Sequence, residues 1–325
     1  MNKRFFSSIA VSIILLAVLI MPAIAFEGDS LAILLSGPEN DNSWNEAAYN
    51  AGIALKEKGV EVAIAESVEA GNAERILRTY SDMGYKMIIG HSFDFGDPVF
   101  TVSEEYPDTY YAWGGGIDQG SENVSDYEQP FYEAAYPIGI IAANVTKTGK
   151  LGAVYGTDIP VCHSMGEAFL AGAKSVNPDI ELISTAVGDW IDVAKAKEAA
   201  LAQSDLGVDF WIECGEGPAL GVIAAAQEVG GYATGYVGDM IENGPSVVLV
   251  NLIWNLEPMF SQMLTDVREG TFDGEYYRFG VAEGAMYFAL NDGLKDVVPQ
   301  EAIDAANQAL EDIKSGKVVV EFIPE

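Results

Sequence analysis

The sequence predicts an α/β protein with two doubly wound lobes, each built on a parallel sheet. Short apolar runs alternate with helical stretches, which is the pattern of βαβ units. This alternation occurs in two successive series, and the chain is longer than one hydrophobic core usually holds. A closed eight-stranded barrel is the alternative for such an alternation, but the number of predicted strands fits it less well.

The first series opens on residues 31–35, an apolar run bounded by Gly37 and Pro38 that is typical of a strand buried on both faces. A helix then ends at Gly59, where the next strand follows. The predicted strands are 31–35, 60–65, 87–90 and 109–113, and the predicted helices are 44–58, 73–83, 97–105 and 132–146.

The second series begins after Gly149, which ends the long apolar helix. The predicted strands are 151–155, 181–186, 208–213, 233–236 and 247–251, separated by helices at 164–175, 192–204 and 219–229. The remaining chain predicts helices at 259–268 and 301–314 and a final strand at 318–322. We therefore expect lobe 1 to comprise residues 26–147 and 255–290, and lobe 2 to comprise 148–254 and 291–325, joined by short crossing segments.

Residues 1–25 are predicted to be an export signal. Lys3 and Arg4 precede an apolar stretch at 9–21, and a small-x-small cleavage pattern lies at 23–25. The expected location of the protein is thus outside the cytoplasm, in the periplasm or at the outer face of the cell membrane. An uncleaved signal that serves as an anchor is the alternative, and no cysteine near the cleavage pattern offers a site for a lipid.

The chain is strongly acidic, with 49 Asp and Glu residues against 17 Lys and Arg residues and a net charge of -32. Nucleic acid and anionic lipid surfaces are not expected as partners, because binding phosphates requires clustered basic residues. Hydrophobic residues make up 49% of the chain, so an ordinary apolar interior is expected beneath the acidic surface.

Cys162 and Cys214 are the two cysteines of the chain, and both follow predicted strands of lobe 2. Their strands are neighbours in the usual strand order, so the thiols either pair in a disulfide or remain free. A metal site is not expected, since tetrahedral zinc needs four ligands. The glycines at 215–221 have the wrong spacing for a dinucleotide site, and no cofactor is predicted.

In open parallel sheets a ligand lies beyond the carboxyl ends of the strands, and aromatic and Asx residues gather there in this sequence. Rings offer faces on which a flat base can stack, while carboxylates and amides can bind its edge. Each ring has an alternative role in the core of its lobe, and the Asx residues before a helix have an alternative role as N-caps. The candidate ligand contacts are Trp44, Phe93, Trp190 and Trp254 for the faces, and Asp41, Asn42 and Asp239 for the edges.

Several segments together resemble the basic membrane protein (BMP) family of ABC transporter substrate-binding proteins. The segments are 40–45 (NDNSWN), 132–139 (YEAAYPIG), 146–152 (TKTGKLG), 177–179 (NPD), 188–192 (GDWID), 238–240 (GDM) and 250–254 (VNLIW). The resemblance implies a type I periplasmic-binding-protein fold with a three-stranded hinge, and a purine nucleoside or nucleobase as ligand. It further implies ABC permease and ATPase subunits as partners. Where a purine-binding subgroup of this family tends to have an Asp-Ser-Pro-Ala run, this sequence has GEGPA at 215–219, so Glu216 becomes a further candidate contact to the base edge.

The expected function is therefore to close two lobes around one small solute, without catalysis. A sensor that binds its ligand and then docks on a signalling receptor uses the same closure and is one alternative. A nucleoside hydrolase using Asp41, Asp239 and Glu216 as acids and bases is another. No activated nucleophile with a base and an orienting group is recognisable, which favours binding over bond cleavage.

Overall fold

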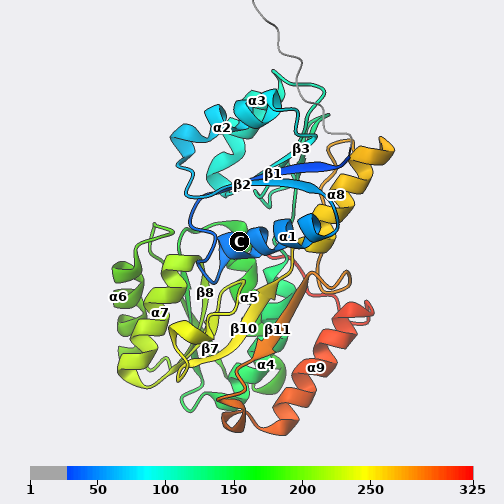
Figure 1. The fold of residues 1–325 in the computed structure, drawn as a ribbon. Coiled ribbons are helices and arrows are strands. Elements are labelled where there is room, and N and C mark those ends of the chain that lie inside the picture. Colours follow the sequence, from blue (N-terminus) through cyan, green and yellow to red (C-terminus); the bar gives the residue numbers. More distant parts are fainter. Residues whose placement is uncertain (1–27, 325) are drawn as a thin grey trace, which may run out of the picture.

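The computed structural model describes residues 28–324. The predicted export signal at 1–25 lies outside the described residues. The described chain forms two lobes that are stacked one above the other in Figure 1. Within residues 28–324, no helix is both long and apolar enough to cross a bilayer.

Lobe 1 is built on a five-stranded parallel sheet in the order β2-β1-β3-β4-β5. Strand β1, which lies between β2 and β3, is buried at all six positions, as its apolar run predicts. The helices α1 and α8 pack together on one side of this sheet, and α2 and α3 pack together on the other. The elements are β1 (Ser30–Leu35), α1 (Trp44–Glu57), β2 (Glu61–Ala65), α2 (Ala70–Asp82), β3 (Met87–His91), α3 (Gly96–Ser103), β4 (Tyr110–Trp113), β5 (Val124–Asp126) and α8 (Glu257–Glu269).

Lobe 2 is built on a six-stranded sheet in the order β11-β10-β9-β8-β6-β7, in which β11 alone is antiparallel to its neighbour. The helices α6 and α7 pack together on one face, while α4 packs with α5 and α9 on the other. The strands are β6 (Lys150–Tyr155), β7 (Glu181–Ala186), β8 (Phe210–Cys214), β9 (Tyr232–Gly235), β10 (Val248–Trp254) and β11 (Met286–Leu290). The helices are α4 (Phe131–Val145), α5 (Pro160–Val176), α6 (Val193–Asp205), α7 (Glu216–Val229) and α9 (Gln300–Lys314).

Two glycines let α4 and α5 approach until their backbones touch. A Cβ at Gly139 would collide with the carbonyl oxygen of Phe169, and a Cβ at Gly172 would collide with that of Tyr136. Such a close approach requires glycine at both positions. In this pair, α5 lies against β6, β7 and β8, and α4 lies against β10 and β11.

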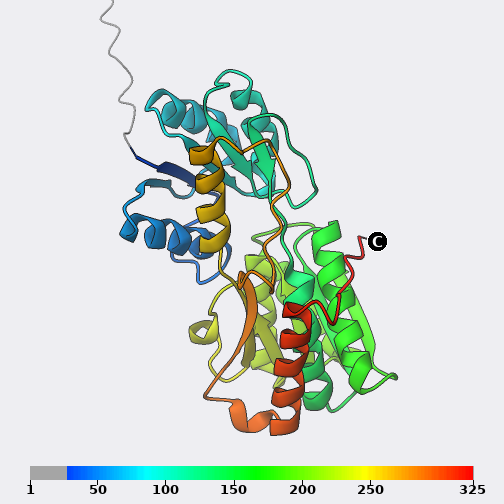
Figure 2. The ribbon, with the colours of Figure 1, turned by 90° about the vertical axis from the view of Figure 1, so that its right-hand side faces the viewer.

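Three segments cross between the lobes, at residues 127–130, 255–256 and 270–285 (Figure 2). The first and third pair with each other, since Tyr127 forms a parallel bridge with Tyr277 and the Glu128 amide donates to the Tyr277 carbonyl over 2.9 Å. The Asn255 amide donates to the Ala285 carbonyl over 2.7 Å, which joins the second segment to the third. The three crossings thus form one hydrogen-bonded hinge.

The two doubly wound lobes are confirmed, and the barrel alternative is wrong because the strands form two separate open sheets. Two of the predicted lobe limits differ from the packing. Helix α4 was expected in lobe 1 but packs against α5 and α9, since its apolar residues face the second sheet. Residues 286–290 were also expected in lobe 1, but they form β11, which pairs with β10.

The predicted strand at 318–322 is wrong. These residues lie extended along the helices of lobe 2, with the Phe322 ring against Tyr132 and the Ile323 amide donating to the Ser164 hydroxyl. A strand needs a neighbouring strand to share its backbone hydrogen bonds, and this segment contacts helices instead.

Candidate ligand site

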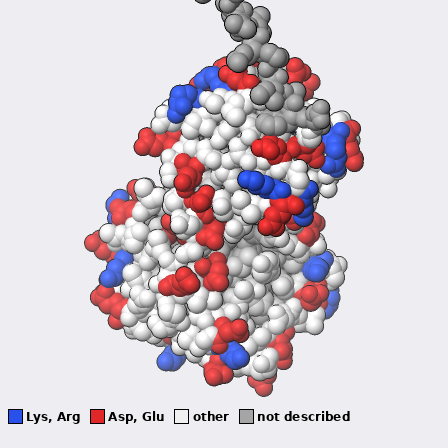
Figure 3. All heavy atoms as spheres, in the orientation of Figure 1, with Lys and Arg blue, Asp and Glu red and all other residues white. Residues whose placement is uncertain are grey.

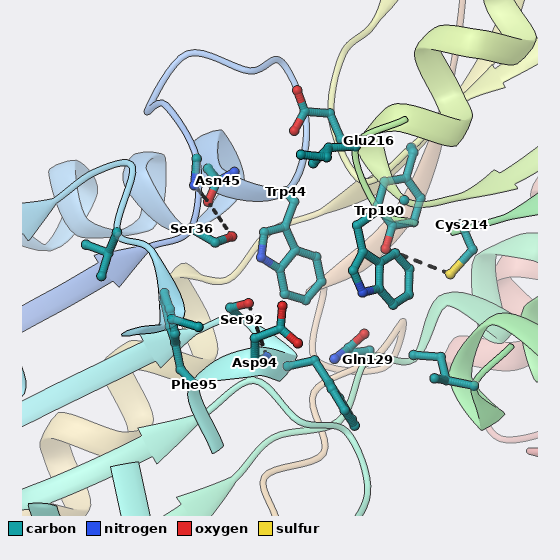
Figure 4. A pocket seen from close by; sticks show the side chains of 18 of the residues that line it. Ser36, Trp44, Asn45, Ser92, Asp94, Phe95, Gln129, Trp190, Cys214 and Glu216 are labelled. Carbon is teal, nitrogen blue, oxygen red and sulfur yellow. Dashed lines mark hydrogen bonds between the residues drawn. The ribbon is translucent and has the colours of Figure 1, made fainter. Parts of the chain in front are cut away.

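A cavity of about 390 Å³ lies between the lobes (Figure 4). This volume falls in the range of small-molecule sites, which is about 300–1,000 Å³. Lobe 1 contributes the start of α1 and the loop after β3, and lobe 2 contributes the loops after β7 and β8. The cavity therefore sits beyond the carboxyl ends of parallel strands, where the sheet topology predicts a ligand.

Trp44 is the first residue of α1 and faces the cavity from lobe 1. Its indole Nε1 donates to the His91 carbonyl over 3.1 Å, and its ring stacks on the imidazole of His91 at 4.3 Å between centroids. One face of the indole is thereby supported from within lobe 1. Phe93, in the loop after β3, adds a second ring on the same side and is 37% exposed.

Trp190 extends toward Trp44 from lobe 2 (Figure 4). Its ring lies on Gly156 and Gly215, where a side chain would occupy its place. Gly215 also has a φ of 118°, a backbone conformation that disfavours other residues. Glycines at the ends of β6 and β8 thus create the slot that holds this ring.

Glu216 begins α7 at the edge of the cavity, and its side chain is half-buried. Burial, and then the negative charge of Asp41 across the lobe boundary, raise the pKa of the Glu216 carboxyl to about 7. The two carboxylates therefore repel each other across the cleft when both are ionised. A ligand group that donates hydrogen bonds would relieve this repulsion.

Asp41 is held by hydrogen bonds at the start of α1. One of its oxygens accepts from the amides of Ser43 and Glu46, and the other accepts from the amide and side chain of Asn45. Three of these four bonds satisfy backbone donors at the start of α1, which is the N-capping alternative considered for this residue. The carboxylate is 8% exposed and does not line the cavity.

Asn42, Asp239 and Trp254 lie away from the cavity and line a second one, of about 730 Å³, between α1 and the β10 and β11 strands. Trp254 is only 2% exposed, so it takes the core role considered as its alternative. Asp239 accepts a hydrogen bond from Asn251 and one from the Ile241 amide. The predicted contacts other than Asp41 are thus divided between two cavities, because the loops that carry them reach different sides of the lobe boundary.

The loop before α1 connects the lobes between these two cavities. The Ser43 hydroxyl donates to the Tyr236 carbonyl over 2.8 Å, and the Asn42 side chain donates to that of Asn243 over 3.4 Å. Gly238 packs so closely on Asn42 that a Cβ there would collide with the Asn42 carbonyl. These three contacts hold the start of α1 against lobe 2.

Asp94, Gln129 and Tyr236 also line the cavity, although they were not predicted as contacts. Asp94 follows Phe93 directly, so its place after β3 was a usable signal. Gln129 comes from a crossing segment, and Tyr236 follows β9. The amide nitrogen of Gln129 donates to the Gly114 carbonyl over 2.9 Å, which fixes the side chain.

The charged residues that line the cavity are all acidic, namely Glu69, Asp94 and Glu216. No lysine, arginine or histidine of the described chain is among the lining residues. Figure 3 shows that acidic side chains outnumber basic ones on the visible face, including along the boundary between the lobes. Phosphate or carboxylate groups on a ligand would be repelled here, whereas groups that donate hydrogen bonds would be attracted.

Cys162 and Cys214 form a disulfide, with their Cα atoms 5.5 Å apart. Cys214 ends β8 and lines the cavity, while Cys162 lies in the first turn of α5. The prediction that the two cysteines follow adjacent strands is confirmed, because β6 and β8 pair in parallel. The bond thus braces the lobe 2 wall of the cavity beside Gly215 and Trp190.

A family model described as "ABC transporter substrate-binding protein PnrA-like" matches residues 29–321. The chain belongs to this family, Bmp. It is accordingly a substrate-binding protein of ABC transporters and not an enzyme, which confirms the expected class.

Individual relatives agree with this assignment. The chain is 30% identical to a purine-binding protein of Brucella abortus, over 87% of this chain and 80% of that protein. It is 29% identical to a putative ABC transporter glucose-binding protein of Haloferax volcanii, over 75% of this chain and 62% of that protein. An ABC transporter solute-binding protein from Aeropyrum pernix has the same fold, with a TM-score of 0.75 at 23% identity over 90% of this chain and 94% of the other.

Proposed function

We propose that this substrate-binding protein holds a purine nucleoside or nucleobase in the cavity between Trp44 and Trp190. The observation that carries the proposal is the approach of these two indoles from opposite lobes, because a flat base can stack on both. The similarity to a protein named for purine binding supports the same ligand class.

Hydrogen bonds at the rim of the base would give the site its selectivity. Asp94 and Glu216 accept hydrogen bonds, from ring N–H groups or ribose hydroxyls, and the Gln129 side chain offers an amide oxygen. The acidic lining also favours a nucleoside over its phosphate ester, since a phosphate would meet carboxylates and no basic side chain. Adenosine should therefore bind far more tightly than adenosine monophosphate.

Binding would close the lobes. Trp44 belongs to lobe 1 and Trp190 to lobe 2, so a ligand that stacks on both is held fully only when the lobes come together. Contacts made only in the closed state shift the population toward closure. We propose that the permease of an ABC importer recognises this closed state outside the cytoplasm and passes the signal to the ATPase subunits. The disulfide supports that location, because disulfides persist in oxidising compartments.

Isothermal titration calorimetry with adenosine, inosine, guanosine, adenine, adenosine monophosphate and glucose tests the proposal. We expect binding of at least one nucleoside or base and little binding of the monophosphate. Trp190→Ala should weaken that binding by about 5- to 150-fold, because stacking on one ring contributes about 1–3 kcal/mol per base.

Tyr287→Ala is the matched control, since Tyr287 is an aromatic residue of the second cavity and is 40% exposed. It should leave the affinity unchanged. Binding of glucose with none of the purines would overturn the purine assignment and favour the chemistry named for the Haloferax relative. Equal losses in both variants would overturn the assignment to the cavity of Trp190.

A further inference from the structure

The side chain beneath Trp44 is a histidine that takes no direct part in lining the cavity. His91 ends β3, is completely buried, and lies with its ring nearly parallel to the indole, at an angle of 18°. A leucine or phenylalanine would fill the same space by packing alone. The polar ring is therefore a feature that requires an explanation.

His91 and Trp44 are joined by two reciprocal hydrogen bonds. The indole Nε1 donates to the His91 carbonyl over 3.1 Å, and the imidazole Nε2 lies 2.9 Å from the Trp44 carbonyl. A carbonyl oxygen only accepts, so Nε2 must carry the imidazole proton. Together with the stacking, these bonds fix both the backbone and the ring plane of Trp44.

The other imidazole nitrogen connects this pair to the hinge. Because Nε2 carries the proton, Nδ1 is the acceptor and the Tyr127 hydroxyl donates to it over 2.7 Å. Tyr127 is fully buried and belongs to the crossing segment that bridges to Tyr277. Burial lowers the pKa of His91 to about 3, so the ring stays neutral and keeps this hydrogen-bond pattern at ordinary pH.

Trp254 completes the cluster from lobe 2. Its ring lies 5.4 Å from that of Trp44, 5.9 Å from that of His91 and 6.2 Å from that of Tyr127. Trp254 ends β10, directly before the second crossing segment. The rings thus form a continuous chain from the cavity wall to two of the three hinge segments.

We propose that His91 is a positioning residue of the ligand site, which fixes the ring plane of Trp44 and ties it through Tyr127 to the hinge. The effect on ligand affinity rests on the proposed function. The effect on Trp44 itself does not depend on the ligand. A Trp44 ring that is held before binding loses less conformational freedom when the ligand stacks on it.

The test uses three variants of the full protein. His91→Phe keeps a stacking ring but removes both ring nitrogens, and Tyr127→Phe removes only the hydroxyl that donates to Nδ1. Tyr111→Phe is the matched control. It removes a hydroxyl that is equally buried, bonded to Ser81 over 2.6 Å in the same lobe but away from the cavity.

Nitrogen-15 spectra of the indole N–H groups report on the five tryptophans, and Trp44→Phe identifies the Trp44 signal. In ligand-free protein, His91→Phe and Tyr127→Phe should shift or broaden this signal, and Tyr111→Phe should not. Affinity for the best nucleoside should fall roughly two- to tenfold in the first two variants, from the cost of ordering one large side chain, and stay unchanged in the third.

An unchanged Trp44 signal in both His91→Phe and Tyr127→Phe would overturn the proposal. So would an affinity loss in Tyr111→Phe as large as that in Tyr127→Phe, because the loss would then follow general destabilisation. If the wild-type protein binds no purine, the proposed function fails, while the Trp44 signal still decides whether His91 positions the ring.

Discussion

Opening the disulfide between Cys162 and Cys214 should destabilise lobe 2 by about 4 kcal/mol. The two residues are 52 positions apart, and the loop-entropy relation gives this value for a closed loop of that length. Urea unfolding followed by circular dichroism measures it, with and without a thiol reductant. Reduction keeps both sulfur atoms in place, so it isolates the cross-link from the packing of the two buried side chains.

The double variant Cys162→Ala/Cys214→Ala provides the control for this experiment. It should be at least as unstable as the reduced wild-type protein, because it also loses buried sulfur atoms, and reductant should not change it further. Nucleoside affinity should fall as well, since the bond braces the wall that holds Trp190. Equal unfolding midpoints for oxidised and reduced wild-type protein would refute the reasoning.

Three further predictions follow from close contacts and from burial. Gly139→Ala should destabilise the protein by about 1–3 kcal/mol in thermal unfolding, because its Cβ would collide with the Phe169 carbonyl; an unchanged melting temperature would show that α4 and α5 are not in contact there. Gly238→Ala should push its loop away from Asn42 and weaken nucleoside binding in calorimetry by roughly 5- to 150-fold, whereas unaltered affinity would mean that this contact does not control closure. Because the pKa of Glu216 is raised, the folded protein binds a proton at this carboxyl more tightly than the unfolded chain does. The stability that this proton contributes is lost as pH rises from about 4.5 to about 7. Glu216→Gln should therefore make the melting temperature fall less over that pH range than in wild type, and parallel pH profiles would contradict the assignment.

The sequence was sufficient to predict most of the fold because the parallel strands are short apolar runs between clear helix ends. Strand β5 was missed because it has only three residues within a polar, glycine-rich segment. Strand β11 was missed because it is an edge strand with a largely exposed or half-exposed pattern, so periodicity does not separate it from a loop. The segment at 318–322 has strand-like residues, but its neighbours are helices.

The candidate site was predicted in part. Trp44, Phe93, Trp190 and Glu216 line one cavity, as expected for residues that follow parallel strands. For Asp41 the sequence left a binding role and a capping role open, and only the placement of nearby backbone amides decides between them.

Residues contributed by the hinge were the hardest to predict. Gln129 and Tyr127 belong to a segment whose place in space depends on how the two lobes are joined, and no local sequence pattern encodes that arrangement. The role of His91 depends on the same arrangement, because its partner Tyr127 lies 36 residues away.

A crystal structure of the complex with the nucleoside that binds most tightly tests the central claim most directly. We predict density for the base between Trp44 and Trp190, with its edge toward Asp94 or Glu216 and the lobes closed around it. Density for the base in the second cavity, against Asn42 and Asp239, would contradict this account.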